Sequence, residues 1–213
     1  MTRMPEKGVR DLAALHELLD EVQVAHVGMF ADGHPLVIPT AMVRDGDRVL
    51  IHGSTGSRWM RHLSQGADAC VSVTALDGVV VARSAFESSF HYRSAVLFGR
   101  FQALDEASED TALDVVVDRL IPGRVSELRR PTAREVAATQ VLAMPIGEWS
   151  LRVSEKWPDD EEDDIAGAAW AGVVPLRTEY GAPEPAPDLR DGIEVPPSVR
   201  ALAGSGGAQP SDE

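Results

Sequence analysis

Hydrophobic and polar positions along the chain follow two recurring patterns. Between Arg10 and Val22 the apolar residues return at helical spacing, which predicts an amphipathic helix with one apolar stripe. After it come short runs that are apolar or alternate between apolar and polar, most of them bounded by turn-forming residues, as is typical of β-strands. The runs cover residues 24–29, 36–43, 49–52, 69–76, 79–82, 92–104 and 140–153.

Asp-Gly steps stand between several of these runs. They occur at Asp32-Gly33, Asp45-Gly46 and Asp77-Gly78. Glycine accepts the positive φ that tight hairpin turns require, so each step predicts a hairpin between antiparallel strands. Pro39 has no N–H to donate to a ladder, and we expect it at a strand edge or a bulge.

Three helices are expected between or after the strands. Residues 57–65 predict a short helix with Trp59, Met60 and Leu63 inward and the basic side chains outward. Residues 108–120 predict a second helix, with acidic residues at its start and Pro122-Gly123 at its end. Thr132 and Glu135 have the spacing of a capping box, which predicts the start of a third.

The last part of the chain has a different composition. Residues 159–164 are all acidic and predict a solvated loop. Residues 168–176 are apolar enough to return to the body of the protein. From residue 181 onward the chain is rich in Pro, Ala and Gly, which predicts a flexible tail. We therefore expect one domain over residues 1–180 and a tail over residues 181–213.

Hairpin-linked strands determine the expected fold class. Six or seven strands joined mostly by hairpins favour a closed antiparallel barrel over a parallel α/β sheet. A length of 213 residues and a hydrophobic fraction of 44% suit one globular domain with a substantial core. The prediction is a mainly β protein with peripheral helices.

Charge and cysteine content narrow the possible functions. The formal net charge is −14, which argues against binding the nucleic-acid backbone. Cys70 is the only cysteine, so no internal disulfide can form, and its alternating surroundings indicate a small buried apolar residue. No stretch has the roughly 18 apolar residues of a membrane helix, and the charged N-terminus does not resemble a secretory signal. We expect a cytoplasmic protein that does not enter a membrane.

Residues 52–58 form the first candidate site. The segment His52-Gly53-Ser54-Thr55-Gly56-Ser57-Arg58 connects an expected strand to an expected helix. Backbone N–H groups, hydroxyl groups and a nearby arginine together suit a phosphate. The alternative is an ordinary connecting loop that leads into a solvated basic face.

Residues 83–94 form the second candidate site. The stretch is polar, with aromatic residues at intervals, and lies between two strongly apolar strands. Loops of this composition on a rigid scaffold often carry binding groups. The alternative is a long hairpin connection whose serines and histidine satisfy backbone groups.

Several enzyme classes lack their required residues. The histidines have no cysteine partners and no HExxH spacing, so we expect no metal site. The chain contains no GxSxG, which argues against a serine hydrolase. It has no GxGxxG after a strand, which argues against a dinucleotide-binding fold. No catalytic residue can be assigned.

The order of short motifs along residues 10–176 resembles the pyridoxamine 5′-phosphate oxidase-like family, on the branch related to nitroimidazole-resistance reductases. The likeness rests on the order and spacing of the motifs together. They are Val37-Ile38-Pro39-Thr40, His52-Gly53-Ser54, Ser57-Arg58, 77–84, Tyr92-Arg93-Ser94, Phe98-Gly99 and Pro122-Gly123-Arg124.

This resemblance implies an FMN-binding split β-barrel, usually a homodimer with two flavins at the subunit interface. The strand at 37–42 would pass the isoalloxazine ring, residues 52–58 would hold the phosphate, and residues 92–94 would contact the ring edge or ribityl chain. The implied cofactor-binding residues are Ile38, Pro39, Thr40, His52, Gly53, Ser54, Ser57, Arg58, Tyr92, Arg93 and Ser94.

The chain departs from the oxidase itself at the phosphate. The oxidase has an Arg-Lys pair there, whereas this chain has Ser57-Arg58 and no lysine, so the resemblance does not carry vitamin B6 oxidation. Similar barrels bind deazaflavin or haem, and His52 is then a candidate axial ligand. Trp170 is either a lid over the flavin or a plain core or lid residue.

The resulting functional hypothesis is an FMN-dependent oxidoreductase. Its partners would be a small acceptor, such as a nitroaromatic or a quinone, and a nicotinamide donor. Hydride transfer needs no side-chain acid or base, since the flavin carries the chemistry. The alternatives are a flavin carrier or redox sensor without turnover, and a barrel that has lost its ligand.

Overall fold

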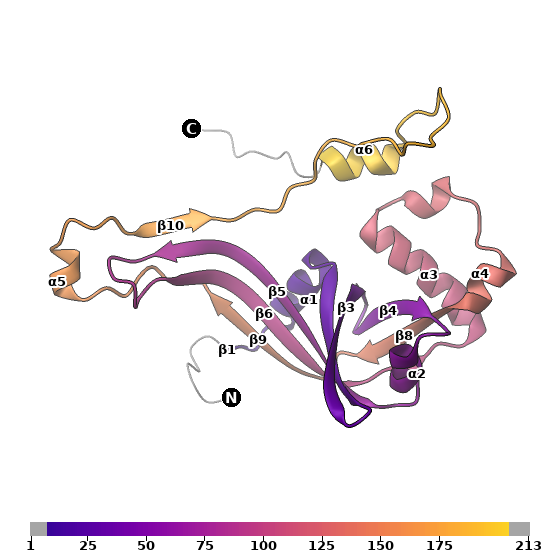
Figure 1. The fold of residues 1–213 in the computed structure, drawn as a ribbon, viewed down its shortest axis with the longest axis horizontal. Coiled ribbons are helices and arrows are strands. Elements are labelled where there is room, and N and C mark those ends of the chain that lie inside the picture. Colours follow the sequence, from indigo (N-terminus) through magenta and orange to yellow (C-terminus); the bar gives the residue numbers. More distant parts are fainter. Residues whose placement is uncertain (1–7, 205–213) are drawn as a thin grey trace.

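The computed structural model describes residues 8–204, which form an antiparallel sheet with helices around it (Figure 1). Seven of the described strands have seven residues or more: β2 (Val24–Ala31), β3 (His34–Asp45), β4 (Arg48–Ser54), β5 (Asp68–Val81), β6 (Ser89–Arg100), β8 (Thr139–Pro145) and β9 (Glu148–Ser154). Three are shorter: β1 (Gly8–Val9), β7 (Gln102–Ala103) and β10 (Gly172–Pro175).

The helices lie at the corners and ends of the sheet. They are α1 (Leu12–Glu21), α2 (Arg58–Ser64), α3 (Glu106–Leu120), the 3-10 turn η2 (Arg124–Glu127), α4 (Ala133–Ala138), α5 (Glu162–Ile165) and α6 (Pro197–Gly204). The predicted capping box of Thr132 and Glu135 is present at α4. The start of α3 is earlier than predicted, because Asp105 accepts a hydrogen bond from the Ser108 N–H and caps the helix.

The strand order is that of a split barrel. Along the sheet it runs β1-β9-β6-β5-β2-β3-β4-β8-β7, with β10 added to β5. The first part of β3 pairs with β2, and its last four residues pair with β4. The strand therefore joins two halves that fold toward each other. The fold class predicted from the hairpins is confirmed.

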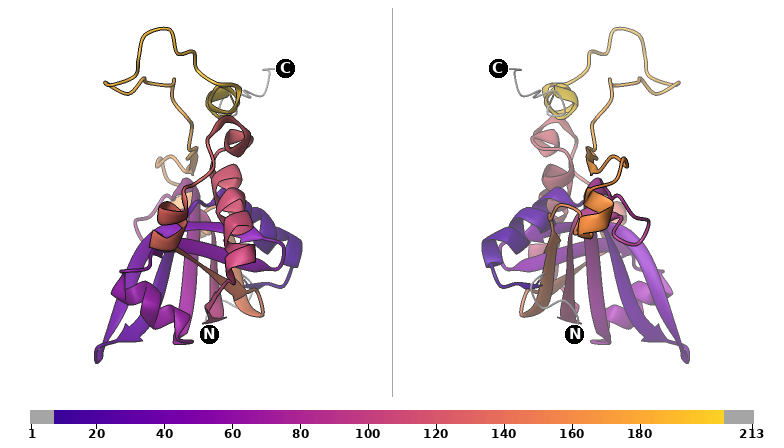
Figure 2. Two further views of the ribbon diagram at one scale, coloured as in Figure 1. Left: turned by 90° about the vertical axis from the view of Figure 1, so that its right-hand side faces the viewer. Right: turned by 90° about the vertical axis from the view of Figure 1, so that its left-hand side faces the viewer.

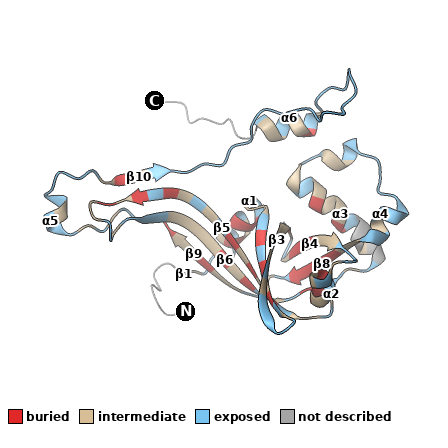
Figure 3. Cartoon of the chain, in the orientation of Figure 1, coloured by how far each residue is buried: buried red, intermediate tan, exposed pale blue. Residues whose placement is uncertain are grey.

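Apolar side chains fill the space between the two halves. Leu97 and Leu151 of one half and Leu142 and Met144 of the other belong to one fully buried cluster. Helix α1 inserts three leucines into this cluster because its apolar stripe faces the barrel. A second cluster lies outside β4 and β8, where α3 packs. Figure 3 shows buried segments on β4, β8 and α3 as well as on α1, β5 and β6.

Two of the three predicted Asp-Gly hairpins form. Asp32 and Gly33 have φ of 53° and 81°, and Gly46 has φ of 59°, as tight hairpin turns require. The third prediction is wrong: β5 runs without a turn through Asp77-Gly78 and has only a bulge there. A Cβ at Gly78 would lie 3.0 Å from the Val174 carbonyl oxygen, so this glycine permits the close approach of β10.

Other strand boundaries also differ from the predictions. The predicted strand at 140–153 is two strands, β8 and β9, which turn at Ile146-Gly147 and join opposite halves of the barrel. The predicted strand at 92–104 begins earlier, at Ser89, and is interrupted at the buried Phe101 rather than at Gly99. A change of sheet partner leaves little trace in local hydrophobic periodicity.

The far ends of β5 and β6 project from the barrel as an arm, with β10 alongside and α5 at the tip (Figures 1 and 2). The acidic run lies here, and it is not wholly solvated. The Asp160 side chain is only 1% exposed and pairs with Arg83, at 2.9 Å, and with the Arg83 backbone N–H, at 2.8 Å. One acid of the run therefore fastens the chain to the tip of the arm.

The segment predicted to be a flexible tail contains α6, and its last residues, 205–213, lie outside the described part. Ser198 is buried and donates both its N–H and its hydroxyl to Glu127 of η2, at 3.0 and 2.5 Å. Further upstream, Gln23 donates to the Tyr180 hydroxyl at 2.9 Å. These contacts hold the C-terminal segment against the body of the protein.

Replacing Glu127 is expected to release α6. Hydrogen bonds from Ser198, helped by Arg124, lower the pKa of Glu127. A lowered pKa means that the anchor is fully present above the usual pKa of glutamate and is lost as pH falls through the lowered one. Glu127→Ala should therefore speed trypsin cleavage after Arg200 several-fold at pH 7.

The matched control for this prediction is Glu194→Ala, which removes an exposed acid from the same segment. Wild-type protein should become as sensitive as the variant to an acid-active protease once the pH falls through the lowered pKa of Glu127. Equal trypsin cleavage of both variants and the wild type would show that Ser198 and Glu127 do not hold α6.

Candidate functional site

The split between β3 and β4 brings two of the predicted segments near each other. The ladder between these strands extends only from Asp45↔Arg48 to Met42↔Ile51. Beyond it, 34–41 pairs with β2 and 52–54 pairs with β8. The edges of Ile38–Thr40 and of His52–Ser54 therefore flank the split without pairing to each other. Backbone N–H and C=O groups there are suited to a polar ligand.

The loop after β4 is the predicted phosphate segment, and two local contacts set its shape. A Cβ at Gly53 would lie 3.1 Å from Met60 Cγ, so glycine lets the loop lie close to α2. The Ser54 hydroxyl accepts a hydrogen bond from the Gly56 N–H at 3.1 Å. Ser57 precedes α2 without capping it through its side chain. Its hydroxyl is therefore free of the helix terminus.

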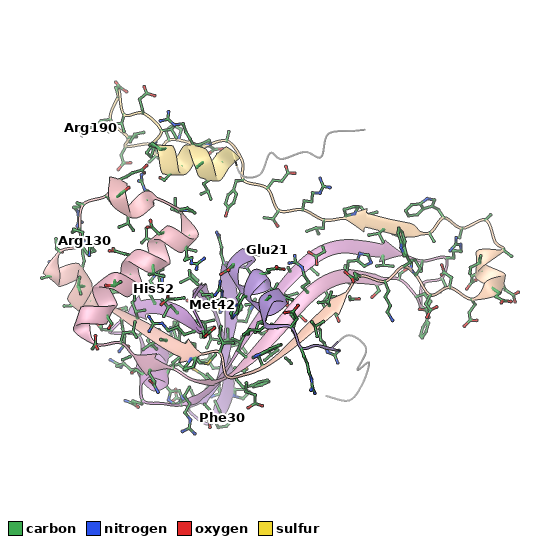
Figure 4. All side chains as sticks on the ribbon, turned by 180° about the vertical axis from the view of Figure 1, so that it is seen from behind. Glu21, Phe30, Met42, His52, Arg130 and Arg190 are labelled. Carbon is green, nitrogen blue, oxygen red and sulfur yellow. The ribbon has the colours of Figure 1, made fainter. Side chains whose placement is uncertain are left out.

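His52 is half-buried on β4, beside α3 (Figure 4). It lies opposite Val141, whose side chain belongs to the cluster covered by α3. Its Nδ1 is buried and has no hydrogen-bond partner among the described residues. Burial lowers the pKa of His52, so the imidazole is neutral at pH 7. A neutral histidine with an unsatisfied nitrogen can serve as a metal ligand.

A groove of about 400 Å³ lies between α2 and the β2–β3 hairpin. We call it the α2 groove; its lining residues are Ala31, Asp32, Leu36, Arg58, Trp59, Arg61, His62 and Gln65. Arg58 donates to Asp32 at 3.0 Å, and the pair is largely solvent-exposed. An exposed pair of this kind contributes little stability, so Arg58 can exchange Asp32 for a ligand.

Arg93 is engaged by two carboxylates. It donates to Asp77 at 2.7 and 3.0 Å and to Glu21 at 2.6 and 2.9 Å. The hydrogen bonds that Arg93 donates to Asp77, and then those to Glu21, raise the pKa of Arg93. The guanidinium thereby fastens β6 to the bulge of β5 and to the end of α1. The sequence-based role of Arg93 at a flavin would require it to leave these partners.

The remaining predicted residues lie on two faces of the sheet. Ile38 and Thr40 pair with Val27 and Ala25, which are core residues, and Pro39 lies on the opposite, outer face. On β6, Tyr92 and Ser94 alternate with the buried Ala95 and Leu97, which also puts them on the outer face. β2 and β5 separate β3 from β6.

The second candidate loop is much shorter than predicted. Only 82–88 connects β5 to β6, because β6 begins at Ser89. Arg83 is paired with Asp160, and Ser84 and Ser88 satisfy backbone groups. The alternative of a plain hairpin connection describes this loop better. Cys70 is half-buried on the outer face, opposite Gly28, rather than within the core.

The α2 groove was not predictable from the sequence. The basic residues of the short helix were visible, but the facing hairpin residues Asp32 and Leu36 are more than twenty positions away in the sequence. Among residues 8–204, no three metal-ligating side chains come together. In the same range, no helix has the length and apolarity needed to cross a membrane.

Both the sequence and the fold of the chain are similar to those of known proteins. Residues 11–153 match the family described as pyridoxamine 5′-phosphate oxidase. No protein of curated function matches the sequence. Among solved structures, the FAD and haem binding protein from Mycobacterium smegmatis is 55% identical, with a TM-score of 0.90, over 92% of this chain and 97% of that chain.

Two further solved structures are similar to this chain at lower sequence identity. The flavocytochrome Anf3 from Azotobacter vinelandii is 37% identical, with a TM-score of 0.89, over 95% of this chain and 94% of that chain. A candidate 5-nitroimidazole antibiotic resistance protein from Bacteroides thetaiotaomicron is 16% identical, with a TM-score of 0.58, over 68% of this chain and 86% of that chain. This third structure supports the fold alone.

The resemblance read from the short motifs is thus confirmed over most of the chain. The likeness to the first two structures extends well beyond residue 153, where the family match ends. The split barrel, its flanking helices and the matched sequence agree with one another. The chain belongs to the pyridoxamine 5′-phosphate oxidase-like family of split-barrel proteins.

Proposed function

We propose that the protein binds a flavin and a haem and uses them in oxidation–reduction. The observation that carries this proposal is the likeness, at 55% identity over nearly the whole of both chains, to a protein described as binding FAD and haem. The flavocytochrome from A. vinelandii, at 37% identity, supports the same pair of cofactors. The family resemblance of the short motifs implies FMN, whereas we propose FAD.

The residues around the split suit a flavin. Ser54, Ser57 and Arg58 offer hydroxyl and guanidinium groups for a phosphate, and backbone edges at 38–40 and 52–54 offer hydrogen bonds to ring and ribityl atoms. The flavin supplies hydride and electron transfer. The protein's residues bind it, orient it and limit its contact with water.

The His52 side chain is suited to ligate a haem iron. The orphaned, buried nitrogen and the lowered pKa of His52 are what an uncharged imidazole ligand needs. A haem is held by few protein ligands, so the absence of a three-residue cluster among the described residues does not argue against it. The haem supplies one-electron chemistry, and His52 would hold its iron.

We also propose a homodimer with the flavin sites at its interface. The outer face of the sheet exposes large apolar side chains, including Phe30 at 64% and Val37 at 59%. Pro39 and Ser94 lie on this face with β2 and β5 between their strands, so the two strands are about 14 Å apart at the usual strand spacing. A flavin that contacts both segments would therefore bind between two chains, with one segment contributed by each chain.

Turnover would transfer electrons from a nicotinamide donor to a small acceptor. A nitroaromatic or a quinone is the proposed acceptor class, and the reaction is tested by stopped-flow absorption. The bound flavin should be reduced by the donor and reoxidised by the acceptor at rates that sustain turnover. A flavin that is retained but not reduced would instead identify a carrier or sensor.

Arg58→Ala is expected to weaken flavin retention about tenfold, because a charge-assisted contact to a phosphate is lost. The measurement is the flavin content after dialysis against increasing volumes of buffer. Arg134→Ala is the matched control, since Arg134 is an exposed arginine on α4. Equal flavin content in both variants and the wild type would refute the phosphate assignment.

A further inference from the structure

The α2 groove begins where the proposed phosphate loop ends. Arg58 belongs to both, since it closes the loop after β4 and also lines the groove. From there the groove continues along α2 toward Gln65, with Leu36 of β3 on the facing side. A ligand whose phosphate lies at Ser57 and Arg58 can therefore extend directly into the groove.

The groove is locally basic in a strongly acidic protein. Arg58, Arg61 and His62 line it, against the single carboxylate of Asp32, although the chain's net charge is −14. Arg58 already pairs with Asp32, and His62 Nε2 lies 3.0 Å from the Phe30 carbonyl oxygen. The exposed Arg61 guanidinium has no partner among the described residues. Arg61 is thus free to bind a further phosphate.

Trp59 gives the groove a rigid aromatic wall. Its side chain is half-buried, packs against the barrel core and also lines the groove. A packed indole ring loses little conformational freedom when a base stacks on it, and aromatic stacking accepts any nucleobase. Gln65, at the end of the groove, adds amide groups that can pair with a base edge.

The volume also suits part of a cofactor. A hollow of about 400 Å³ is within the range of small-ligand sites, about 300–1,000 Å³. An FMN held by the loop would leave it empty. The two arginines, Arg58 and Arg61, suit two phosphates. The aromatic wall of Trp59 and the polar end at Gln65 suit an adenine base.

We propose that the α2 groove binds the adenosine-phosphate half of FAD and makes the protein select FAD over FMN. The inference rests on the proposed function, because it needs the flavin phosphate at Ser57 and Arg58. The same chemistry occurs in the adenosine half of a nicotinamide dinucleotide. The experiment must therefore separate the two sources.

The test is a competition on the full-length protein. Holoprotein is incubated with equal concentrations of FAD and FMN, separated from free flavin, and the bound flavins are quantified after release. Wild-type protein should hold FAD in large excess. Arg61→Gln should lower the bound FAD-to-FMN ratio about tenfold without lowering FMN binding, and Trp59→Phe should largely preserve the ratio because it keeps the aromatic wall.

Arg134→Gln is the matched control, because it removes the same charge from an exposed site on α4, and it should leave the ratio unchanged. A ratio unaffected by Arg61→Gln would overturn the inference, as would a wild type that prefers FMN. So would an Arg61→Gln variant that keeps its FAD preference and loses only NADPH binding, measured by calorimetry. A wild type that binds neither flavin would instead refute the proposed function.

Discussion

His52→Ala is expected to yield a protein that retains flavin but has lost its haem Soret band. The alanine cannot ligate iron, and His52 is the described histidine with an unpartnered buried nitrogen on β4 at the split. Its removal leaves the loop residues Ser54, Ser57 and Arg58 unchanged, so flavin binding should persist. The measurement is the ratio of haem to flavin absorbance in the purified variant.

His34→Ala is the matched control, since His34 is exposed at the start of β3, away from β4. It should keep the wild-type ratio. Circular dichroism of both variants checks that the barrel is intact. A His52→Ala protein with the full Soret band would mean that another residue holds the iron, and His52 would then be an ordinary half-buried histidine.

Val37→Asp is expected to convert the protein to a monomer and to remove most of its flavin. Val37 is 59% exposed in the single chain, so a carboxylate there is solvated and the barrel should still fold. In a dimer that uses the outer face, the same carboxylate would be buried without a partner. That costs several kcal/mol, so the dimer should weaken at least a hundredfold.

Light scattering after size-exclusion chromatography gives the mass of each form. The matched control is Gln102→Asp, which adds the same charge at an exposed residue of β7. That variant should remain dimeric and yellow. A Val37→Asp protein that stays dimeric would show that the outer face is not the interface. A wild type that is monomeric with a full complement of flavin would contradict the shared site.

Local chemistry explains which elements were predictable. Asp32-Gly33 and Gly46 form the predicted turns with positive φ, and no other atom lies within 4 Å of where a Cβ would be at either glycine. Asp77-Gly78 has the same local signal, yet the chain runs straight through it. Asp77 is paired with Arg93, and Gly78 lies against β10, which is almost one hundred residues later. Only the tertiary contacts distinguish the third step from the first two.

The candidate site was also predictable only where the evidence for it is local in the sequence. The loop at 52–58 was visible because glycines, hydroxyls and an arginine follow an apolar strand and precede a helix. The predicted inward and outward sides of that helix also agree with the structure: Met60 and Leu63 are fully buried. The engagement of Arg93 by Glu21 was not predictable, because α1 and β6 come together only in the fold.

The C-terminal segment shows where composition misleads. Pro, Ala and Gly predicted a flexible tail, and composition alone contains no sign of a docking partner. The buried Ser198 and its two hydrogen bonds to Glu127 depend on η2, seventy residues earlier. Contacts with residues far away in the sequence thus hold a segment whose own composition predicts little structure.

We expect this split barrel to carry both a flavin and a haem, and an absorption spectrum with mass analysis of the released cofactors measures this directly. The full-length protein is purified, then incubated with FAD and haemin, and freed of unbound ligand. We expect flavin and Soret bands together, and FAD and haem in the released fraction. A colourless protein that takes up neither cofactor would contradict it.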